Sequence, residues 1–190
     1  MRRYGKIFLF VLGGLLILNS CATYKTEIIT GRIEKITYQN TYIKTRKYEG
    51  VIFSKDYNIW GVPNSDNTFT PTIAEIDFAE MILRKGIKET NKYRLNQVGD
   101  CPVIDRKLHK YKRQYFGVVD STGNKIIIIN CFWDRKGFYG FWDKYILKEP
   151  EDNKWKTEKE MVLDGCSYHW TIKVNLRNKE LFDLEVNGIG

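Results

Sequence analysis

The segment TPTIAEIDFAEMILRKGIKETNK, residues 70–92, has the clearest structural pattern in the chain. Thr72 and Glu75 have the spacing of a capping box, in which the threonine hydroxyl accepts the N3 amide proton and the glutamate carboxylate accepts the N-cap amide proton. Apolar residues then recur every three or four positions, and lysines follow toward the end, where they complement the helix dipole. The segment therefore predicts a helix of about twenty residues beginning at Ile73, the longest in the chain.

The sequence after this helix predicts antiparallel strands. Lys112–Val119 and Lys125–Trp133 flank the turn sequence Asp120-Ser121-Thr122-Gly123. The second segment contains isoleucine at positions 126–129, which is typical of a central strand covered on both faces.

A second hairpin is expected further along the chain. Lys156–Leu163 and Cys166–Leu176 flank Asp164-Gly165, and this dipeptide favours a hairpin because the turn needs positive φ. Alternate residues from Tyr168 to Leu176 are apolar, which predicts one buried face. Leu181–Val186 is expected to form the last strand.

The part of the chain before the helix has weaker patterns. We expect a short tether, then two strands on either side of Gln39-Asn40, then a loop over 49–67 with one short strand. A helix laid on an antiparallel meander is a two-layer α+β solution. The order of elements resembles cystatin-like and NTF2-like domains, which implies a cleft between helix and sheet in the NTF2-like case.

The N-terminus has the three parts of an export signal. Arg2, Arg3 and Lys6 precede an apolar run over 7–18, and small residues follow. The run is shorter than the roughly 20 residues needed to span a bilayer. It therefore predicts a signal peptide that is removed.

Leu18-Asn19-Ser20-Cys21 resembles the lipobox of bacterial lipoproteins. The resemblance implies cleavage before Cys21, diacylation of its thiol, and acylation of the new amino terminus, with palmitate as one such chain. Ala22 in place of Asp implies sorting to the outer membrane of the cell envelope. We therefore divide the chain into a signal peptide over 1–20, a lipidated tether over 21–28 and a single α+β domain over 29–190. The body also resembles small uncharacterised lipoproteins common in Bacteroidota, through its Asp164-Gly165 hairpin and terminal Asn187-Gly188, and this resemblance implies no activity.

The charge of the mature chain is moderately basic. Removal of 1–20 takes away three of the 31 basic residues and leaves 28 against 23 acidic ones, a formal charge of +5. An exported chain rarely meets nucleic acid, so we expect no nucleic-acid partner. Anionic lipid, a glycan or an acidic protein is the expected counterpart, unless the charge only solvates the surface.

Three cysteines remain once Cys21 is assigned to lipid. Cys101, Cys131 and Cys166 allow at most one internal disulfide in an oxidising compartment, in any of three pairings. The chain is therefore not a disulfide scaffold.

No motif for catalysis or metal binding is present. The chain contains two histidines, His109 and His169, and no nucleophile motif surrounds any serine or cysteine. Cys166 and His169 would point to opposite faces of a strand, which disfavours a shared metal ion. Asp77 and Glu80 are expected near the helix start for its dipole rather than for catalysis. We assign no catalytic residue, no metal site and no cofactor.

Two stretches could bind a partner. Residues 109–115 alternate cations with aromatic side chains, which suits phosphate or sulfate groups, although the pattern also fits an exposed edge strand. The segment 132–145 places rings beside glycines, which favours a loop that presents aromatic anchors, although the rings could also cap the core. From this second stretch we select Trp133, Tyr139, Phe141 and Trp142 as the partner-binding residues.

The sequence therefore predicts a lipid-anchored cell-envelope domain with a protein or glycan partner and the membrane as its anchor, and it favours a binding protein over an enzyme. The alternatives are a small-ligand or enzyme pocket in the cleft between helix and sheet, and a structural accessory of a larger envelope complex.

Overall fold

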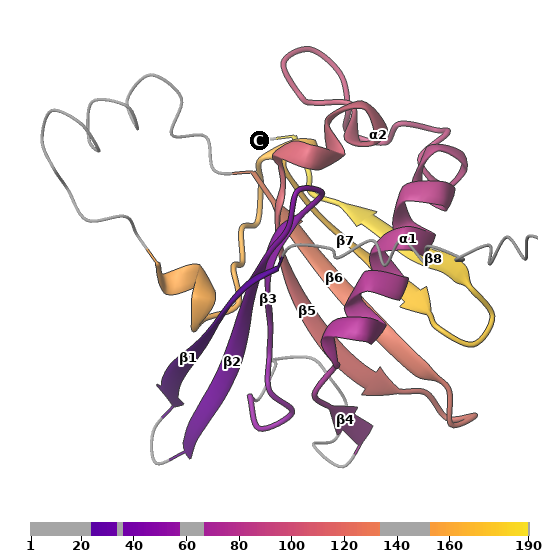
Figure 1. Cartoon of the computed structure of the whole chain (residues 1–190). Coiled ribbons are helices and arrows are strands. Elements are labelled where there is room, and N and C mark those ends of the chain that lie inside the picture. Colours follow the sequence, from indigo (N-terminus) through magenta and orange to yellow (C-terminus); the bar gives the residue numbers. More distant parts are fainter. Residues whose placement is uncertain (1–23, 34–35, 58–66, 134–152, 190) are drawn as a thin grey trace, which may run out of the picture.

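The computed structural model describes residues 24–33, 36–57, 67–133 and 153–189. They form an α+β fold in which α1 (Ile73–Thr90) lies across one face of an eight-stranded, mostly antiparallel sheet (Figure 1). The α+β class expected from the sequence is confirmed.

Helix α1 begins where the capping box predicts. The Glu75 amide donates to Thr72 Oγ1 at 3.2 Å, and the Thr72 amide donates to Glu75 Oε2 at 2.8 Å. The helix has 18 residues and is the longest helix in the described part of the chain. Its apolar stripe, which includes Ile76 and Leu83, is fully buried against the sheet.

The sheet has the strand order β1-β2-β3-β5-β6-β7-β8, with the short β4 paired to β5. All pairs are antiparallel except β3 and β5, because the chain passes through α1 before it returns to the sheet. The expected meander after the helix is confirmed as β5 to β8. The strand bounds are β1 Lys25–Ile33, β2 Ile36–Lys44, β3 Glu49–Ile52, β4 Thr68–Phe69, β5 Lys112–Val119, β6 Lys125–Phe132, β7 His169–Asn175 and β8 Glu180–Val186.

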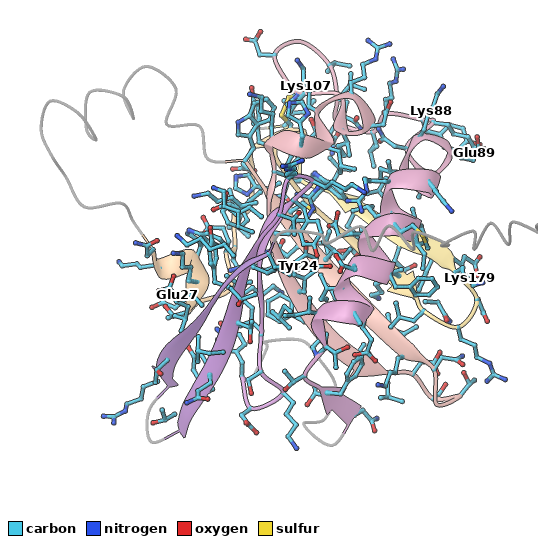
Figure 2. All side chains as sticks on the ribbon, in the orientation of Figure 1. Tyr24, Glu27, Lys88, Glu89, Lys107 and Lys179 are labelled. Atoms are coloured by element: carbon cyan, nitrogen blue, oxygen red, sulfur yellow. A yellow bond between two sulfur atoms is a disulfide. The ribbon has the colours of Figure 1, made fainter. Side chains whose placement is uncertain are left out.

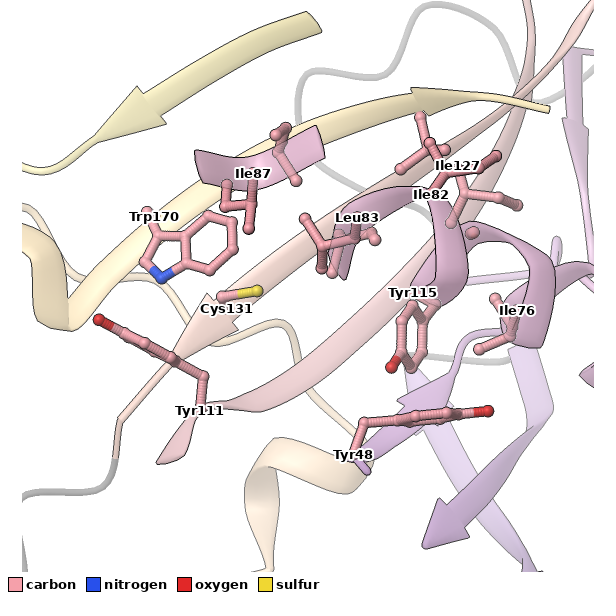
Figure 3. Close-up of a cluster of buried hydrophobic side chains, with 14 of the residues drawn as sticks. Tyr48, Ile76, Ile82, Leu83, Ile87, Tyr111, Tyr115, Ile127, Cys131 and Trp170 are labelled. Carbon is pink, nitrogen blue, oxygen red and sulfur yellow. The ribbon is translucent and has the colours of Figure 1, made fainter. Parts of the chain in front are cut away.

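Both faces of the sheet are covered. On the α1 face, the core combines aliphatic helix residues with aromatic strand residues such as Tyr115 and Trp170 (Figure 3). On the other face, a second cluster is built largely of rings, including Phe53, Phe116 and Trp155. The isoleucines of β6 lie between these two cores, so the prediction of a doubly covered central strand is confirmed.

The second face is covered by the segment 153–160, which was predicted to be partly strand. No strand is assigned to 156–163. Buried amides on the sheet bind its backbone instead: Asn40 Nδ2 donates to Lys156 O at 3.0 Å, and Gln114 Nε2 donates to Trp155 O at 2.7 Å. Because these side chains take up the backbone of the segment, the hairpin predicted at Asp164-Gly165 does not form.

Two further boundaries differ from the prediction. Gln39-Asn40 lies inside β2, paired with β1, so the expected turn at this dipeptide is wrong. Strand β1 begins at Lys25, within the segment 21–28 that was predicted as a tether.

Candidate functional site

Three loops meet at one end of the molecule, and a disulfide joins two of them. Cys101 in the loop after α1 bonds to Cys166, which begins the short 3-10 helix η5 (Cys166–Tyr168). Among the three pairings that the sequence left open, this one is formed, and Cys131 is buried outside it. Burial raises the pKa of the Cys131 thiol, so it stays protonated and unreactive at neutral pH.

The loop after α1 is held by a buried amide network. Asn91 ends the helix, and its Nδ2 donates to Gln97 Oε1 and to Asp105 Oδ1, both at 2.9 Å. Gln97 Oε1 also accepts the Ile104 amide at 2.9 Å, which ties the loop to α2 (Ile104–Lys107). These bonds fix the loop backbone while most of its side chains point outward.

Asparagine side chains join this loop to the other two. Asn96 Nδ2 donates to Asn187 O at 2.8 Å, and Asn187 Nδ2 in turn donates to the backbone oxygens of Val162 and Asp164. The Cys166 amide donates to Gly188 O at 2.8 Å. The loop after α1, the segment before η5 and the C-terminal segment therefore form one continuous surface.

This surface exposes aliphatic side chains. Leu163 is 95% exposed, and Leu95 and Val98 are 62% and 66% exposed. A soluble domain seldom places several aliphatic residues together on ordered backbone without a partner for them. We call the set the stapled surface; it consists of Leu95, Val98, Met161, Val162, Leu163 and Ile189.

Trp133 lies beside the stapled surface. Its ring packs against Tyr168 with centroids 5.3 Å apart, and its amide donates to Tyr168 O at 2.9 Å. It is half-buried and contacts the α1 core, so part of its ring has a packing role. The other predicted partner-binding residues, Tyr139, Phe141 and Trp142, lie outside the described residues.

A basic concavity adjoins the stapled surface at the C-terminal end of α1. It has a volume of about 640 Å³ and shares the loop residues Tyr93 and Arg94 with that end of the molecule. Its other charged lining residues are Lys85, Lys88, Glu89, Lys92 and Asp105.

Residues 112–115 of the stretch 109–115 do not belong to an edge strand. Within it, β5 is a central strand between β3 and β6, and Arg113 and Tyr115 point into the α1 core. The edge-strand interpretation is wrong, and the partner-binding interpretation of the stretch stays a prediction. The sequence did not show that Arg113 faces the core, where it is matched by an acid on α1. That acid is Glu80.

Glu80 and Arg113 form a buried ion pair. Arg113 Nε lies 2.7 Å from Glu80 Oε1, and the two side chains are 1% and 0% exposed. Burial disfavours the charged guanidinium, but the Glu80 carboxylate outweighs this and raises the pKa of Arg113. Arg84 Nη1 and the Tyr115 hydroxyl donate to the same carboxylate at 2.8 and 3.0 Å. This site is closed to substrate and positions α1 on the sheet.

Asp77 accepts hydrogen bonds from two tyrosines. The Tyr48 hydroxyl donates to Asp77 Oδ1 at 2.7 Å, and the Tyr24 hydroxyl donates to Oδ2. Burial and the Asp77 carboxylate raise the pKa of Tyr48, so its hydroxyl remains a donor. These bonds fasten the start of the described chain to α1.

The described residues contain no group of histidine, cysteine and carboxylate side chains placed to hold a metal ion. Within the same residues, no helix is both long and apolar enough to cross a bilayer.

The sequence does not single out the stapled surface. Met161, Val162 and Leu163 belong to the segment Lys156–Leu163 that is predicted as a strand. The available pattern was an aliphatic residue on each side of Asn96-Gln97 and a run of three before a glycine turn.

The fold and the stapled surface define a small α+β domain with a candidate interaction face. No protein-family model matches the chain, and searches of curated proteins and of solved structures each returned no match. Its function is therefore argued from its own residues.

Proposed function

We propose that this chain is a lipid-anchored domain of the bacterial cell envelope, held in the outer membrane through acylated Cys21, and that its stapled surface binds another envelope protein. The observation that carries the proposal is the Cys101–Cys166 disulfide beneath that surface. Disulfides persist in oxidising compartments outside the cytosol, as the export signal over 1–20 also predicts.

The chemistry of the surface favours a protein over a glycan. Glycans stack on aromatic rings, whereas Leu95, Val98 and Leu163 are aliphatic and suit an apolar pocket or groove on a protein. Trp133 lies at the rim, where a large ring adjoins the patch. The segment that starts after it contains Tyr139, Phe141 and Trp142, which we propose as additional anchors of the same interface.

The alternative function, a ligand or enzyme pocket between helix and sheet, has less support. The order of α1 and β5 to β8 favours the cystatin-like or NTF2-like arrangement expected from the sequence. In the described residues, however, side chains fill the space between the two layers: Ile76, Leu83 and Ile129 are fully buried there. The basic concavity lies at the end of α1 instead.

The anchor is tested by metabolic labelling with palmitate and an intact mass of the protein from its own envelope. We expect a mass that corresponds to residues 21–190 with acyl chains, and loss of label in Cys21→Ser. Unchanged labelling of this variant would contradict the anchor at Cys21.

The interface is tested by a photo-crosslinking residue placed at Leu163 in cells. We expect one discrete adduct with an envelope protein, and its loss when Leu95 and Val98 are both changed to serine. The control position is Ile28 on β1, which is 60% exposed and outside the stapled surface. Equal adducts from both positions would contradict a specific interface.

The proposed aromatic anchors have a separate test. Changing Tyr139 and Trp142 to alanine should abolish the Leu163 adduct and leave the melting temperature nearly unchanged. A large fall in melting temperature would show that these rings belong to the core.

A further inference from the structure

We propose that the outward stripe of α1 rests on the anionic phospholipid headgroups of the membrane that holds the anchor. The inference rests on the proposed acylation of Cys21 and adds an orientation of the folded domain and a second lipid contact. The residues that form the contact are Met81, Arg84, Lys85, Lys88 and Lys92, which we call the α1 stripe.

The chain between the proposed anchor and the fold is short. Only Ala22 and Thr23 separate Cys21 from Tyr24. Three residue steps reach about 10 Å even when fully extended. The Tyr24 hydroxyl donates a hydrogen bond to Asp77, and β1 begins at the next residue. The connection from Cys21 to the fold is therefore no longer than these three residue steps.

Asp77, which binds Tyr24, lies on the same face of α1 as the stripe. Residues spaced three or four apart on a helix lie on one face, which places Asp77, Met81 and Lys88 in one row. Met81, Lys85, Lys88 and Lys92 are exposed, and Arg84 is partly exposed. Tyr24 lies beside α1, and Lys88 lies nearer the C-terminal end of that helix (Figure 2). A bilayer within reach of Cys21 would therefore lie beside this row.

The α1 stripe and the concavity beside it carry a net positive charge. The stripe and the adjoining concavity present Lys85, Lys88, Lys92 and Arg94 against Glu89 and Asp105. Glu89 is paired with Lys92 at 3.0 Å, and Asp105 accepts from Asn91 at 2.9 Å. The surface therefore keeps an excess of positive charge, which complements an anionic leaflet.

The anchor is short enough for lysines of the α1 stripe to be attracted to lipid headgroups. Salt screens exposed charges over about 8–10 Å at physiological ionic strength, which is similar to the reach of the anchor. Each Lys or Arg near an anionic leaflet strengthens binding about fivefold. Met81, at the start of the stripe, adds an exposed apolar side chain that suits the lipid interface.

The test is acetylation footprinting of the acylated full-length mature protein in vesicles of phosphatidylcholine with and without phosphatidylglycerol. We expect Lys85 and Lys88 to be acetylated about fivefold more slowly when phosphatidylglycerol is present. Lys154, which lies on the opposite face of the sheet, and Lys55 serve as internal references and should not change. The protection should disappear in high salt.

A charge-reversal pair provides the matched control. Lys85→Glu with Lys88→Glu should remove the protection of Lys92, and Lys55→Glu with Lys154→Glu should retain it. Melting temperatures of both variants check that the fold is intact, which we expect because all four lysines are exposed.

The outcomes separate this inference from the proposed anchor. An acylated protein whose Lys85 and Lys88 react as fast with phosphatidylglycerol as without it would overturn the inference and leave the anchor intact. Protection in native envelopes but not in lipid vesicles would also overturn it, because an acidic protein would then cover the stripe. An intact mass with an unmodified Cys21 would overturn both.

Discussion

At the scale of single residues, the buried pair of Glu80 and Arg113 determines how α1 sits on the sheet. The sequence shows an acid near a helix start and an arginine among aromatic residues, and each has an ordinary surface explanation. Their pairing depends on which helix face meets which strand face, and the sequence does not contain that information. A charge inside a periodic apolar pattern was the available indication.

Removing Glu80 should destabilise the domain strongly. Glu80→Ala leaves the guanidinium of Arg113 buried without its counter-ion, which should lower the free energy of unfolding by about 3–5 kcal/mol. Arg84→Ala removes a partly exposed partner of the same carboxylate and should cost about 1 kcal/mol or less. Urea denaturation of both variants measures the difference.

A double variant distinguishes the ion pair from simple packing. Glu80→Leu with Arg113→Met removes both charges, so it should be less destabilised than Glu80→Ala although it changes more atoms. If the double variant is the less stable of the two, the pair contributes net stability rather than mainly avoiding an unpaired charge.

At the scale of elements, the predictable parts are those whose partners are close in sequence. Helix α1 follows from its capping box and apolar spacing, and β5 with β6 follows from the turn between them. The strand predicted over 156–163 was wrong because the backbone of this region binds the side-chain amides of Asn40, Gln114 and Asn130, which lie on strands far away in the sequence. The β1–β2 turn was displaced because Asn40 is one of these buried amides, although its residue type favours turns.

The capping box gives α1 a pH-dependent start. Partial burial would raise the pKa of Glu75, but hydrogen bonds from Lys125 and Thr72 outweigh it and lower the pKa below the ordinary value of 4.5. The folded state therefore favours the carboxylate. The stabilisation is present above the pKa of the unfolded chain and is lost as the pH falls through the lower folded value.

Thr72→Ala should reduce the free energy of unfolding by about 1 kcal/mol at neutral pH, because the Glu75 amide loses its acceptor. Glu75→Gln should cost stability at neutral pH and nothing at a pH below the folded pKa of Glu75. Thermal denaturation of both variants from neutral pH to acid measures this convergence. A cost for Glu75→Gln that is independent of pH would contradict a role for the carboxylate charge.

At the scale of the whole molecule, the parts that could not be predicted are long-range pairings. The parallel contact of β3 with β5, the choice of Cys166 for Cys101 and the joining of three loops into the stapled surface all link residues distant in sequence. The α+β class and the β5 to β8 meander could be predicted because each depends on local periodicity. Of the residues in and beside the candidate interface, the sequence singles out Trp133. The aliphatic residues are recognised by their exposure, which the sequence does not show.

The proposed anchor, the α1 stripe and the stapled surface are related through the arrangement of the whole molecule. In the proposed arrangement, the short connection from Cys21 to Tyr24 holds the α1 stripe at the bilayer, so a longer connection should release it. Inserting a flexible Gly/Ser segment of about ten residues after Ala22 gives it a root-mean-square span of about 17 Å and lowers the effective concentration of the stripe at the lipid. Lys85 and Lys88 should then be acetylated faster on phosphatidylglycerol vesicles, with acylation and melting temperature unchanged.

The control is the same segment appended after Gly190, which lengthens the chain without changing the distance from Cys21 to the fold. The appended variant should keep the protection of Lys85 and Lys88, because neither the anchor nor the contact between Tyr24 and Asp77 is altered. The inserted variant should still crosslink through Leu163. The stapled surface is held by the Cys101–Cys166 disulfide and by hydrogen bonds from the side chains of Asn96 and Asn187, which the insertion does not change. If the insertion leaves lysine protection unchanged, the stripe binds lipid strongly enough without help from the short connection, and the geometric argument from Cys21 would fail.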